Sequence, residues 1–263
     1  MPYEYILVEQ RDRVGVVTFN QPDRLNVFSY DMFAEVRQAI ETFNEDSGVG
    51  AVVLTGSGRA FCAGADIRGW NREIEARESG GERRRPREEE NWVHFIQRSK
   101  PVICAINGLS IGVGLTMTLP CDVRIASDSA RLSMRFVRVG VLPELASTRI
   151  LVQIVGLTQA MELMLSGRII DAAEAGRIGL VNRVVPDDEL MDHAFDTAAE
   201  IAFNPAESLA TIKRLVWSNL AETDIGEVLK RENTEFAAAM ERPAFKEAVS
   251  AFLEKRRPDF HRG

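Results

Sequence analysis

The stretch Arg59-Ala-Phe-Cys-Ala-Gly-Ala-Asp-Ile67 organises the rest of this 263-residue chain. It follows an apolar run of strand length, Ala51-Val-Val-Leu-Thr55, and a turn, Gly56-Ser-Gly58. The residues Ala63-Gly-Ala65 carry so little side chain that their backbone N–H groups can face a ligand. Exposed N–H groups at the end of a strand can hold an anion or an oxyanion. The same pattern is equally compatible with a tight turn that binds nothing.

A second turn of small residues follows another apolar segment, Pro101–Ile106. Here Asn107-Gly-Leu-Ser-Ile-Gly-Val-Gly114 leads into a short helix expected from about Val113 to Leu119. The turn is not a dinucleotide fingerprint, because the third glycine would fall at Met117, and no Gly-Lys-Ser/Thr of a phosphate loop follows. A helix that begins here would stabilise developing negative charge at its N-terminus.

Apolar periodicity predicts alternating strands and helices in the first half of the chain and helices in the last third. Such an order favours a mixed or parallel sheet with helical cover. Strands are expected at 5–8, 14–19, 51–55, 101–106, 121–126 and 180–185. Helices are expected from the cap Ser29 to about Asn44, and at 91–98, 147–156, 158–167, 171–176, 188–203, from 205, 223–240 and 243–255. Residues 1–200 therefore form the predicted core, and residues 201–263 a helical oligomerisation region.

Ile67–Glu90 has a different composition. It contains Arg83-Arg-Arg-Pro-Arg87, followed at once by Glu88-Glu-Glu90. A run that carries both signs within a few residues is poor at attracting a polyanion. We predict a solvated, mobile excursion rather than a binding arm.

Composition excludes several classes of function. A net charge of −7 and a pI near 5.2 argue against a general nucleic-acid-binding protein. The chain contains no apolar run of membrane-spanning length and no signal pattern at its start. Three cysteines without paired spacing, Cys62, Cys104 and Cys121, predict reduced thiols in the cytoplasm and no metal site.

Taken together, four segments resemble the crotonase (enoyl-CoA hydratase/isomerase) superfamily. They are residues 59–67, 100–108, 121–126 and 167–181, and the resemblance covers nearly the whole chain apart from 68–95, where this family varies in length. The resemblance implies an α/β fold, a spiral of ββα units with a C-terminal helical trimerisation region. It also implies acyl-CoA thioesters as substrates, with coenzyme A as part of the substrate and no separate cofactor, and a homotrimer or a dimer of trimers.

The family holds the thioester carbonyl between two backbone N–H groups. Carried over by position, these belong to Ala63 and Val113, and the thioester would also meet Gly64, Ala65 and Asp66. Two such donors stabilise the negative charge that enolisation places on the thioester oxygen. Val113 departs from the glycine usual in the family; the donor survives, but the isopropyl group narrows the pocket.

Asp66 is a weaker candidate for the catalytic base, and it is expected instead to orient the 63–66 loop by capping local N–H groups. Two further side chains receive roles by the resemblance, each with an ordinary structural alternative. Arg24 lies where a basic residue commonly meets the nucleotide phosphates, although it is equally compatible with an ordinary turn arginine. Lys255 resembles the tail that reaches the coenzyme A of a neighbouring subunit, and alternatively a cation at a helix end.

The acidic residues decide which reaction is expected. Hydratases of this family hold water with two glutamates, and the corresponding positions here are Thr116 and Phe136. Neither is acidic, which disfavours hydration by that mechanism. Instead, Gly140-Val-Leu-Pro-Glu144 resembles the Δ3,Δ2-enoyl-CoA isomerases, in which a lone glutamate moves a proton between C2 and C4.

Glu144 is therefore the predicted base, with a surface or helix-terminal acid as the alternative. Four apolar neighbours, Val139, Val141, Leu142 and Leu145, would desolvate it and raise its pKa. The prediction is an enoyl-CoA isomerase of fatty-acid or related acyl-CoA metabolism. The alternatives are a hydratase or hydrolase of the same fold, and an acyl-CoA-binding protein without catalysis.

Overall fold

Two β-sheets form the centre of the structure, a computed structural model that describes residues 3–79 and 91–261. The larger sheet has the strand order β1-β2-β3-β5-β7-β10, and the smaller has the order β4-β6-β8-β9. The strands of the larger sheet are β1 (Ile6–Arg11), β2 (Val14–Phe19), β3 (Ala51–Gly56), β5 (Val102–Ile106), β7 (Val123–Ser127) and β10 (Arg183–Val185). Those of the smaller sheet are β4 (Ala60–Cys62), β6 (Leu109–Ile111), β8 (Arg131–Ser133) and β9 (Ile170–Asp171).

The same step between the sheets occurs three times. Strands β3, β5 and β7 lie parallel in the larger sheet, and each is followed by β4, β6 or β8 in the smaller one. A helix then returns the chain to the next strand of the larger sheet, as parallel pairing requires. Only the edges depart from this pattern, because β1 and β9 pair antiparallel with β2 and β8. The predicted spiral of ββα units is confirmed.

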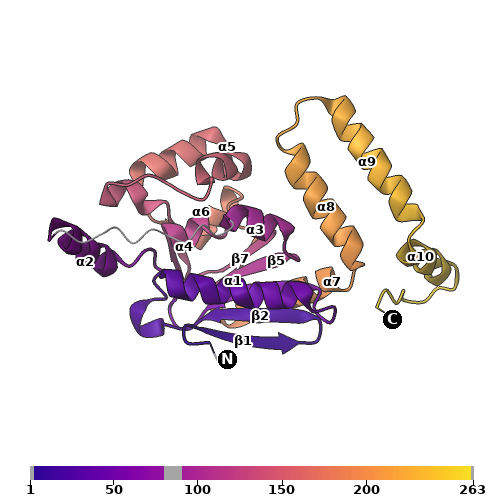
Figure 1. Cartoon of the computed structure of the whole chain (residues 1–263), viewed down its shortest axis with the longest axis horizontal. Helices are drawn as coiled ribbons and strands as arrows, with labels where there is room; N and C mark the ends of the chain where they lie inside the picture. The colour runs from indigo at the N-terminus through magenta and orange to yellow at the C-terminus, as the bar shows by residue number, and fades with distance from the viewer. Residues whose placement is uncertain (1–2, 80–90, 262–263) are drawn as a thin grey trace.

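Helices cover both faces of the larger sheet. The helices of the core are α1 (Tyr30–Glu45), α2 (Ile67–Glu78), α3 (Trp92–Arg98), α4 (Val113–Thr116), α5 (Ser147–Ser166), α6 (Ala172–Arg177) and α7 (Leu190–Ala202). Three 3-10 turns accompany them, η1 (Pro22–Arg24), η2 (Arg135–Val139) and η3 (Asp187–Glu189). Helix α1 runs along β1 and β2 (Figure 1), and α7 packs on β3, β5 and β7. The buried side chains accordingly form two apolar clusters, one on each side of the sheet.

Local sequence signals explain where several helices begin and end. The hydroxyl of Ser29 accepts the N–H of Met32 at 3.2 Å and caps α1, as predicted. Gly156 leaves the helical conformation inside α5, with φ 77° and ψ 162°, at the break that the sequence predicts. Ser147 is the first residue of α5, whereas the residue in the capping position is Ala146.

The predicted solvated excursion at Ile67–Glu90 contains a helix that the sequence analysis did not predict, because Ile67–Glu78 forms helix α2. Ile67, Trp70 and Ile74 recur at helical spacing, a pattern that the charged neighbours obscure. The charged run at 83–90 lies outside the described residues.

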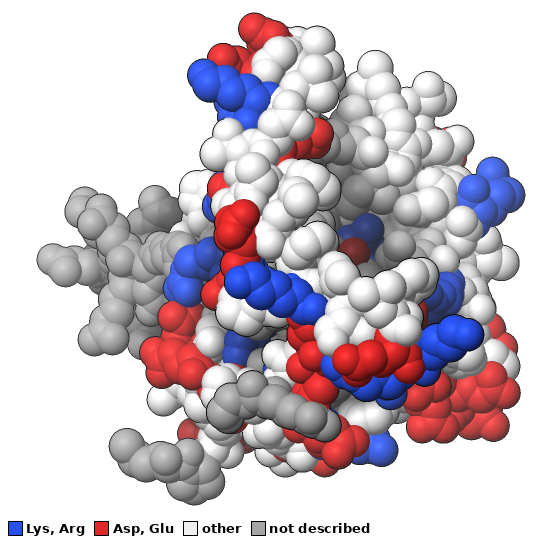
Figure 2. Space-filling view, turned by 90° about the vertical axis from the view of Figure 1, so that its right-hand side faces the viewer, with Lys and Arg blue, Asp and Glu red and all other residues white. Residues whose placement is uncertain are grey.

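The C-terminal helices stand apart from the sheets. Helix α8 (Ala206–Asn219) projects from the core, α9 (Ile225–Met240) runs back alongside it, and α10 (Pro243–Leu253) follows at the lower end of α9, on the opposite side of the molecule from α2 (Figure 1). Their exposed large apolar residues are Ile212, Val216, Leu220, Ile225, Leu229, Phe236, Met240, Phe245, Val249, Phe252 and Leu253. Figure 2 looks onto this side, where uncharged surface separates bands of charged side chains.

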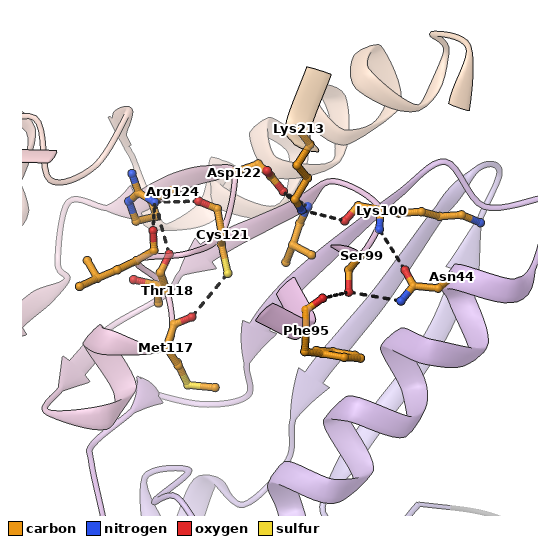
Figure 3. Close-up of polar contacts among 12 residues, drawn as sticks. Asn44, Phe95, Ser99, Lys100, Met117, Thr118, Cys121, Asp122, Arg124 and Lys213 are labelled. Carbon is orange, nitrogen blue, oxygen red and sulfur yellow. Dashed lines mark hydrogen bonds and ion pairs between the residues drawn. The ribbon is translucent and has the colours of Figure 1, made fainter. Parts of the chain in front are cut away.

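One ion pair attaches the projecting helices to the core. The Nζ of Lys213 in α8 lies 2.7 Å from Oδ2 of Asp122, at the start of β7, and donates to the carbonyl oxygen of Lys100 (Figure 3). Lys213 is buried, whereas no residue of α9 is. Among the residues that the structure describes, no helix is long and apolar enough to cross a membrane.

Candidate active site

The segment after β4 is held in place by the loop before α1. The buried side chain of Asn26 donates to the carbonyl oxygens of Ser57 and Ala60, at 2.9 and 2.7 Å, and so fixes this loop against the turn between β3 and β4. The N–H of Phe28 then donates to the carbonyl of Gly64 at 2.7 Å. These bonds give residues 63–66 one defined path along the loop.

The predicted first oxyanion donor needs correction. The N–H of Ala63 already donates to the carbonyl oxygen of Leu25 at 3.0 Å, so it is not available to a ligand. In the described part of the chain, the N–H of Ala65 has no acceptor. Because Gly64 takes a positive φ of 104°, the chain reverses direction between the two alanines. The outward donor of this segment is therefore Ala65.

The second donor lies where α4 begins. Val113 is the first residue of this helix, and its N–H finds no acceptor within the described residues, as expected for a helix N-terminus. Gly112 precedes it with φ 57° and ψ −120°, a conformation that strongly favours glycine. A Cβ on Gly114 would lie 2.1 Å from the carbonyl oxygen of Cys62, so α4 begins directly against the end of β4. The two small-residue turns of the sequence thus meet in space.

Glu144 joins this arrangement through the same helix. Its Oε1 accepts a hydrogen bond from Oγ1 of Thr116 at 2.7 Å, and Thr116 is fully buried one helical turn after Val113. Burial raises the pKa of the Glu144 carboxyl, and the hydrogen bond from Thr116 lowers it less. Although the residue as a whole is exposed, its carboxylate reaches inward.

The apolar cover expected around Glu144 is wrong in its details. Val139 and Val141 are exposed, and 84% of Leu142 is accessible to solvent. Of the four, Leu145 packs against the core. Leu145 and Ala146 both adopt left-handed φ angles, 55° and 54°, so the chain turns sharply after Glu144. The neighbours of Glu144 in sequence are thus mostly exposed, and the contact of its carboxylate with the core is the hydrogen bond from the buried Thr116 of α4.

The two positions at which hydratases of this family carry glutamates are Thr116 and Phe136, and both residues are buried. Phe136 is buried in η2, and its Cζ lies 4.0 Å from where a Cβ of Gly112 would stand. An aromatic edge thus occupies the space beside the second donor. Of the three positions 116, 136 and 144, residue 144 alone carries a carboxylate, and that carboxylate accepts the hydroxyl of Thr116.

Arg24 and Asp66 are paired with each other. Nη2 of Arg24 lies 2.8 Å from Oδ2 of Asp66, and Arg72 of α2 lies 3.5 Å from the same oxygen. Burial raises the pKa of Asp66, but the N–H of Gly69 and the guanidinium of Arg24 outweigh it and hold this pKa below its usual value. The pair places a half-exposed guanidinium at the rim of the segment that carries Ala65.

Lys255 does not join the site of its own chain. It follows α10, which lies on the far side of the molecule from α2 (Figure 1). It is exposed and has a positive φ of 55°. Its predicted contact with a neighbouring subunit stays a prediction.

Sequence reasoning missed two parts of the site. The contacts of residues 63 and 64 with Leu25 and Phe28 join segments that no local pattern connects. The bond between Thr116 and Glu144 had one available signal, because Thr116 lies three residues after Val113 and hence on the same side of a helix.

The N–H groups of Ala65 and Val113 and the desolvated carboxylate of Glu144, which binds Thr116 on the helix of Val113, are groups that can form and stabilise an enolate. On a spiral of ββα units, such groups suit an enzyme that acts on acyl thioesters. Residues 9–263 match the model of the enoyl-CoA hydratase/isomerase family. The chain belongs to this family.

Individual relatives span the whole chain. It is 36% identical to a probable enoyl-CoA hydratase of Mycobacterium bovis, over 99% of both chains. It is 34% identical to the 1,2-epoxyphenylacetyl-CoA isomerase of Escherichia coli, over 98% of both. The crystal structure of enoyl-CoA hydratase from Bacillus anthracis superposes with a TM-score of 0.87 at 29% identity, covering 98% of this chain and 99% of that one. The relatives include both hydratases and an isomerase, so they fix the class of enzyme and not its reaction.

Proposed function

We propose that this enzyme of the enoyl-CoA hydratase/isomerase family is an isomerase that moves a carbon–carbon double bond, with Glu144 as its base. The observation that carries the proposal is the contact between Glu144 and Thr116. It puts the carboxylate beside the helix that presents the Val113 donor, while positions 116 and 136 carry no acid.

The chemistry follows from these groups. The thioester oxygen of a 3-enoyl-CoA would accept hydrogen bonds from the N–H groups of Ala65 and Val113. Glu144 would remove a proton from C2, and the electron pair would move onto the thioester oxygen as the enolate forms. Each donor in such a pair typically lowers the barrier by about 3 kcal/mol. Return of the proton to C4 completes the shift of the double bond to C2=C3.

Hydration requires two acid–base groups, whereas the residues around Val113 supply one carboxylate, that of Glu144. Adding water across a double bond calls for one group that activates the water and one that delivers a proton. Glu144 supplies one carboxylate, and Phe136 fills the place of the other with an aromatic ring. Hydration is the second candidate, because several relatives carry that name.

The decisive experiment incubates 3-enoyl-CoA and 2-enoyl-CoA esters with the enzyme, separates the products by liquid chromatography and identifies them by mass spectrometry. An isomerase interconverts them without a change in mass, whereas a hydratase adds one water. Glu144→Gln should reduce isomerisation by at least about a hundredfold. Glu162→Gln is the matched control. Glu162 lies within α5, which follows the loop of Glu144, but it forms a surface ion pair with Arg168.

Isomerisation that survives in Glu144→Gln would refute the assignment of the base. A gain of one water by the wild type would favour the hydratase. Acyl-CoA binding measured by calorimetry, with no turnover of any ester, would indicate a binding protein without catalysis.

The exposed apolar face of α8–α10 is best explained by other copies of this chain. Exposed apolar surface on this scale is unusual for a monomer. The site residues of one chain lie far from its own α10 (Figure 1), so the tail of a neighbouring copy would bring Lys255 toward the coenzyme A held near Arg24. A homotrimer or a dimer of trimers in light scattering would support this arrangement, and a monomer would contradict it.

A further inference from the structure

The two carboxylate oxygens of Glu144 have different surroundings. Oε1 accepts the hydroxyl of Thr116 at 2.7 Å, while Oε2 has no hydrogen-bond partner in the described part of the chain. The same hydroxyl also lies 3.4 Å from the carbonyl oxygen of Val113. Since a hydroxyl donates one proton, it can serve one of these acceptors at a time. The shorter bond, to the charged acceptor, is the stronger.

No charged side chain takes over the role of Thr116. On the elements that flank the loop of Glu144, Arg138 donates to the carbonyl of Ser166 and Arg149 to that of Leu220. Arg135 points to solvent. Across the site, Asp66 is held by Arg24. The hydroxyl of Thr116 is thus the polar group that orients the carboxylate.

We propose that Thr116 is a positioning residue that fixes Oε1 of Glu144, so that Oε2 alone carries the proton between C2 and C4. The inference rests on the proposed isomerase function and deepens it. In the first step, the C2–H bond breaks and an O–H bond forms at Oε2, while the electron pair moves to the thioester oxygen. In the second step, the O–H bond at Oε2 breaks and the former C3=C4 pair forms the new bond between C4 and the proton. The C1=C2 pair of the enolate moves to C2=C3, and the electron pair on the thioester oxygen restores the C1=O bond. The atoms and electrons balance without any other reactant.

A fixed carboxylate has a measurable consequence. With Oε1 held, the carboxyl group does not rotate to exchange its proton with water before the proton returns. Part of a deuterium label at C2 should then appear at C4. Without the hydroxyl, the carboxylate loses both its orientation and the bond that stabilises its ionised form.

Three variants separate the hydroxyl from the shape of the side chain. Thr116→Val keeps the shape and removes the hydroxyl, whereas Thr116→Ser keeps the hydroxyl. The matched control is Thr118→Val, because Thr118 is equally buried, and its hydroxyl donates to the carbonyl of Leu115 at 2.8 Å, away from Glu144.

The expected result for Thr116→Val is a fall in kcat of about ten- to a hundredfold, as misplacement of a catalytic group produces. KM for the CoA ester should stay unchanged, because the hydroxyl of Thr116 is engaged with Glu144 and the carbonyl oxygen of Val113. The acidic limb of the pH–rate profile should move to higher pH, and less label should reach C4. Thr116→Ser should restore most of each property, and Thr118→Val should behave as wild type.

An unchanged pH profile and unchanged label transfer in Thr116→Val would overturn the proposal. So would a loss in Thr116→Ser as large as that in Thr116→Val. If the wild type isomerises no tested ester, the proposed function itself fails. The role of Thr116 is then still decided by difference infrared titration of the Glu144 carboxyl, wild type minus Glu144→Gln. In that titration, Thr116→Val should raise the pKa of Glu144, and an unchanged pKa would refute the contact.

Discussion

The ion pair between Lys213 and Asp122 allows a sharp prediction about stability. Both partners take part in other bonds, since Oδ2 of Asp122 also accepts the N–H of Val102 at 2.7 Å, and Lys213 also donates to the carbonyl of Lys100 at 3.4 Å (Figure 3). The side chain of Lys213 is 6% exposed, whereas that of Asp122 is 24% exposed. The two charges therefore differ in how well water can stabilise each one alone.

This difference in burial predicts an asymmetry between two substitutions. Asp122→Asn leaves a buried ammonium group without a counter-charge, and removing one partner of a buried pair costs about 3–5 kcal/mol. Lys213→Met leaves a carboxylate that keeps the Val102 N–H and contact with water, so its cost should be about 1–2 kcal/mol. Asp122→Asn is thus expected to lower the free energy of unfolding by roughly 2 kcal/mol more than Lys213→Met.

Urea denaturation followed by circular dichroism, at one fixed protein concentration, measures these changes. The neighbouring pair Arg214–Glu235 provides the control, because its N–O distance is also 2.7 Å but its side chains are 57% and 27% exposed. Arg214→Met should cost less than about 1 kcal/mol. If Lys213→Met proves as costly as Asp122→Asn, or if both match Arg214→Met, burial does not govern this contact and the reasoning fails.

Three other predictions concern the site and the projecting helices. Gly114→Ala would place a Cβ directly against the carbonyl oxygen of Cys62, so it should abolish turnover and destabilise the fold by about 1–3 kcal/mol. Gly176→Ala is the control, because its helical position has more room, and it should change neither property. Activity assays and urea unfolding test both variants. Burial raises the pKa of Glu144 above its unfolded value of about 4.3, so the stability that the protonated carboxyl contributes is fully present below that value and is lost as pH rises through the folded pKa. Glu144→Gln should therefore be at least as stable as wild type at pH 7 in urea unfolding. Lower stability of the variant would contradict the burial of this carboxyl. Phe236 is 68% exposed on α9, so Phe236→Asp should dissociate an oligomer in light scattering while leaving the helix content unchanged, and an intact assembly would show that α9 does not form the interface.

The sequence predicted elements that carry their own signals. The bounds of Val14–Phe19 agree with the structure, the cap at Ser29 is confirmed, and Gly156 breaks α5 as expected. In each case the relevant physics lies within a few residues, in an apolar period, a capping hydroxyl or a positive φ.

The smaller sheet had no such signal. Its strands β4, β6, β8 and β9 are two or three residues long, too short for an alternating pattern to be distinguished from a turn. They pair with partners that are tens of residues away, as in the register that joins Leu109 to Arg131. Pairing of this kind is set by the larger sheet, which brings the ends of β3, β5 and β7 side by side.

The proposed oxyanion donors show the same limit on a smaller scale. Ala63 and Ala65 have identical side chains, so no property of the residues themselves decides which N–H faces outward. The decision rests on the carbonyl of Leu25, 38 residues earlier in the chain, which takes the N–H of Ala63. The sequence therefore located the segment and the kind of chemistry, but the structure selects the atom.

Position 116 links the question of the reaction to the fold. In the sequence, Thr116 was informative only because it stands where hydratases carry a glutamate, which argued against hydration. In the structure, its hydroxyl holds the carboxylate of Glu144, which comes from a loop 28 residues later. An acid at 116 would place one carboxylate directly on α4, next to any acid that reached in from residue 144, and the two like charges would repel each other. The threonine removes that conflict and gives Glu144 a hydrogen-bond donor in its place. The proposed isomerase chemistry with one base thus depends on a residue at 116 that binds an acid rather than carrying one.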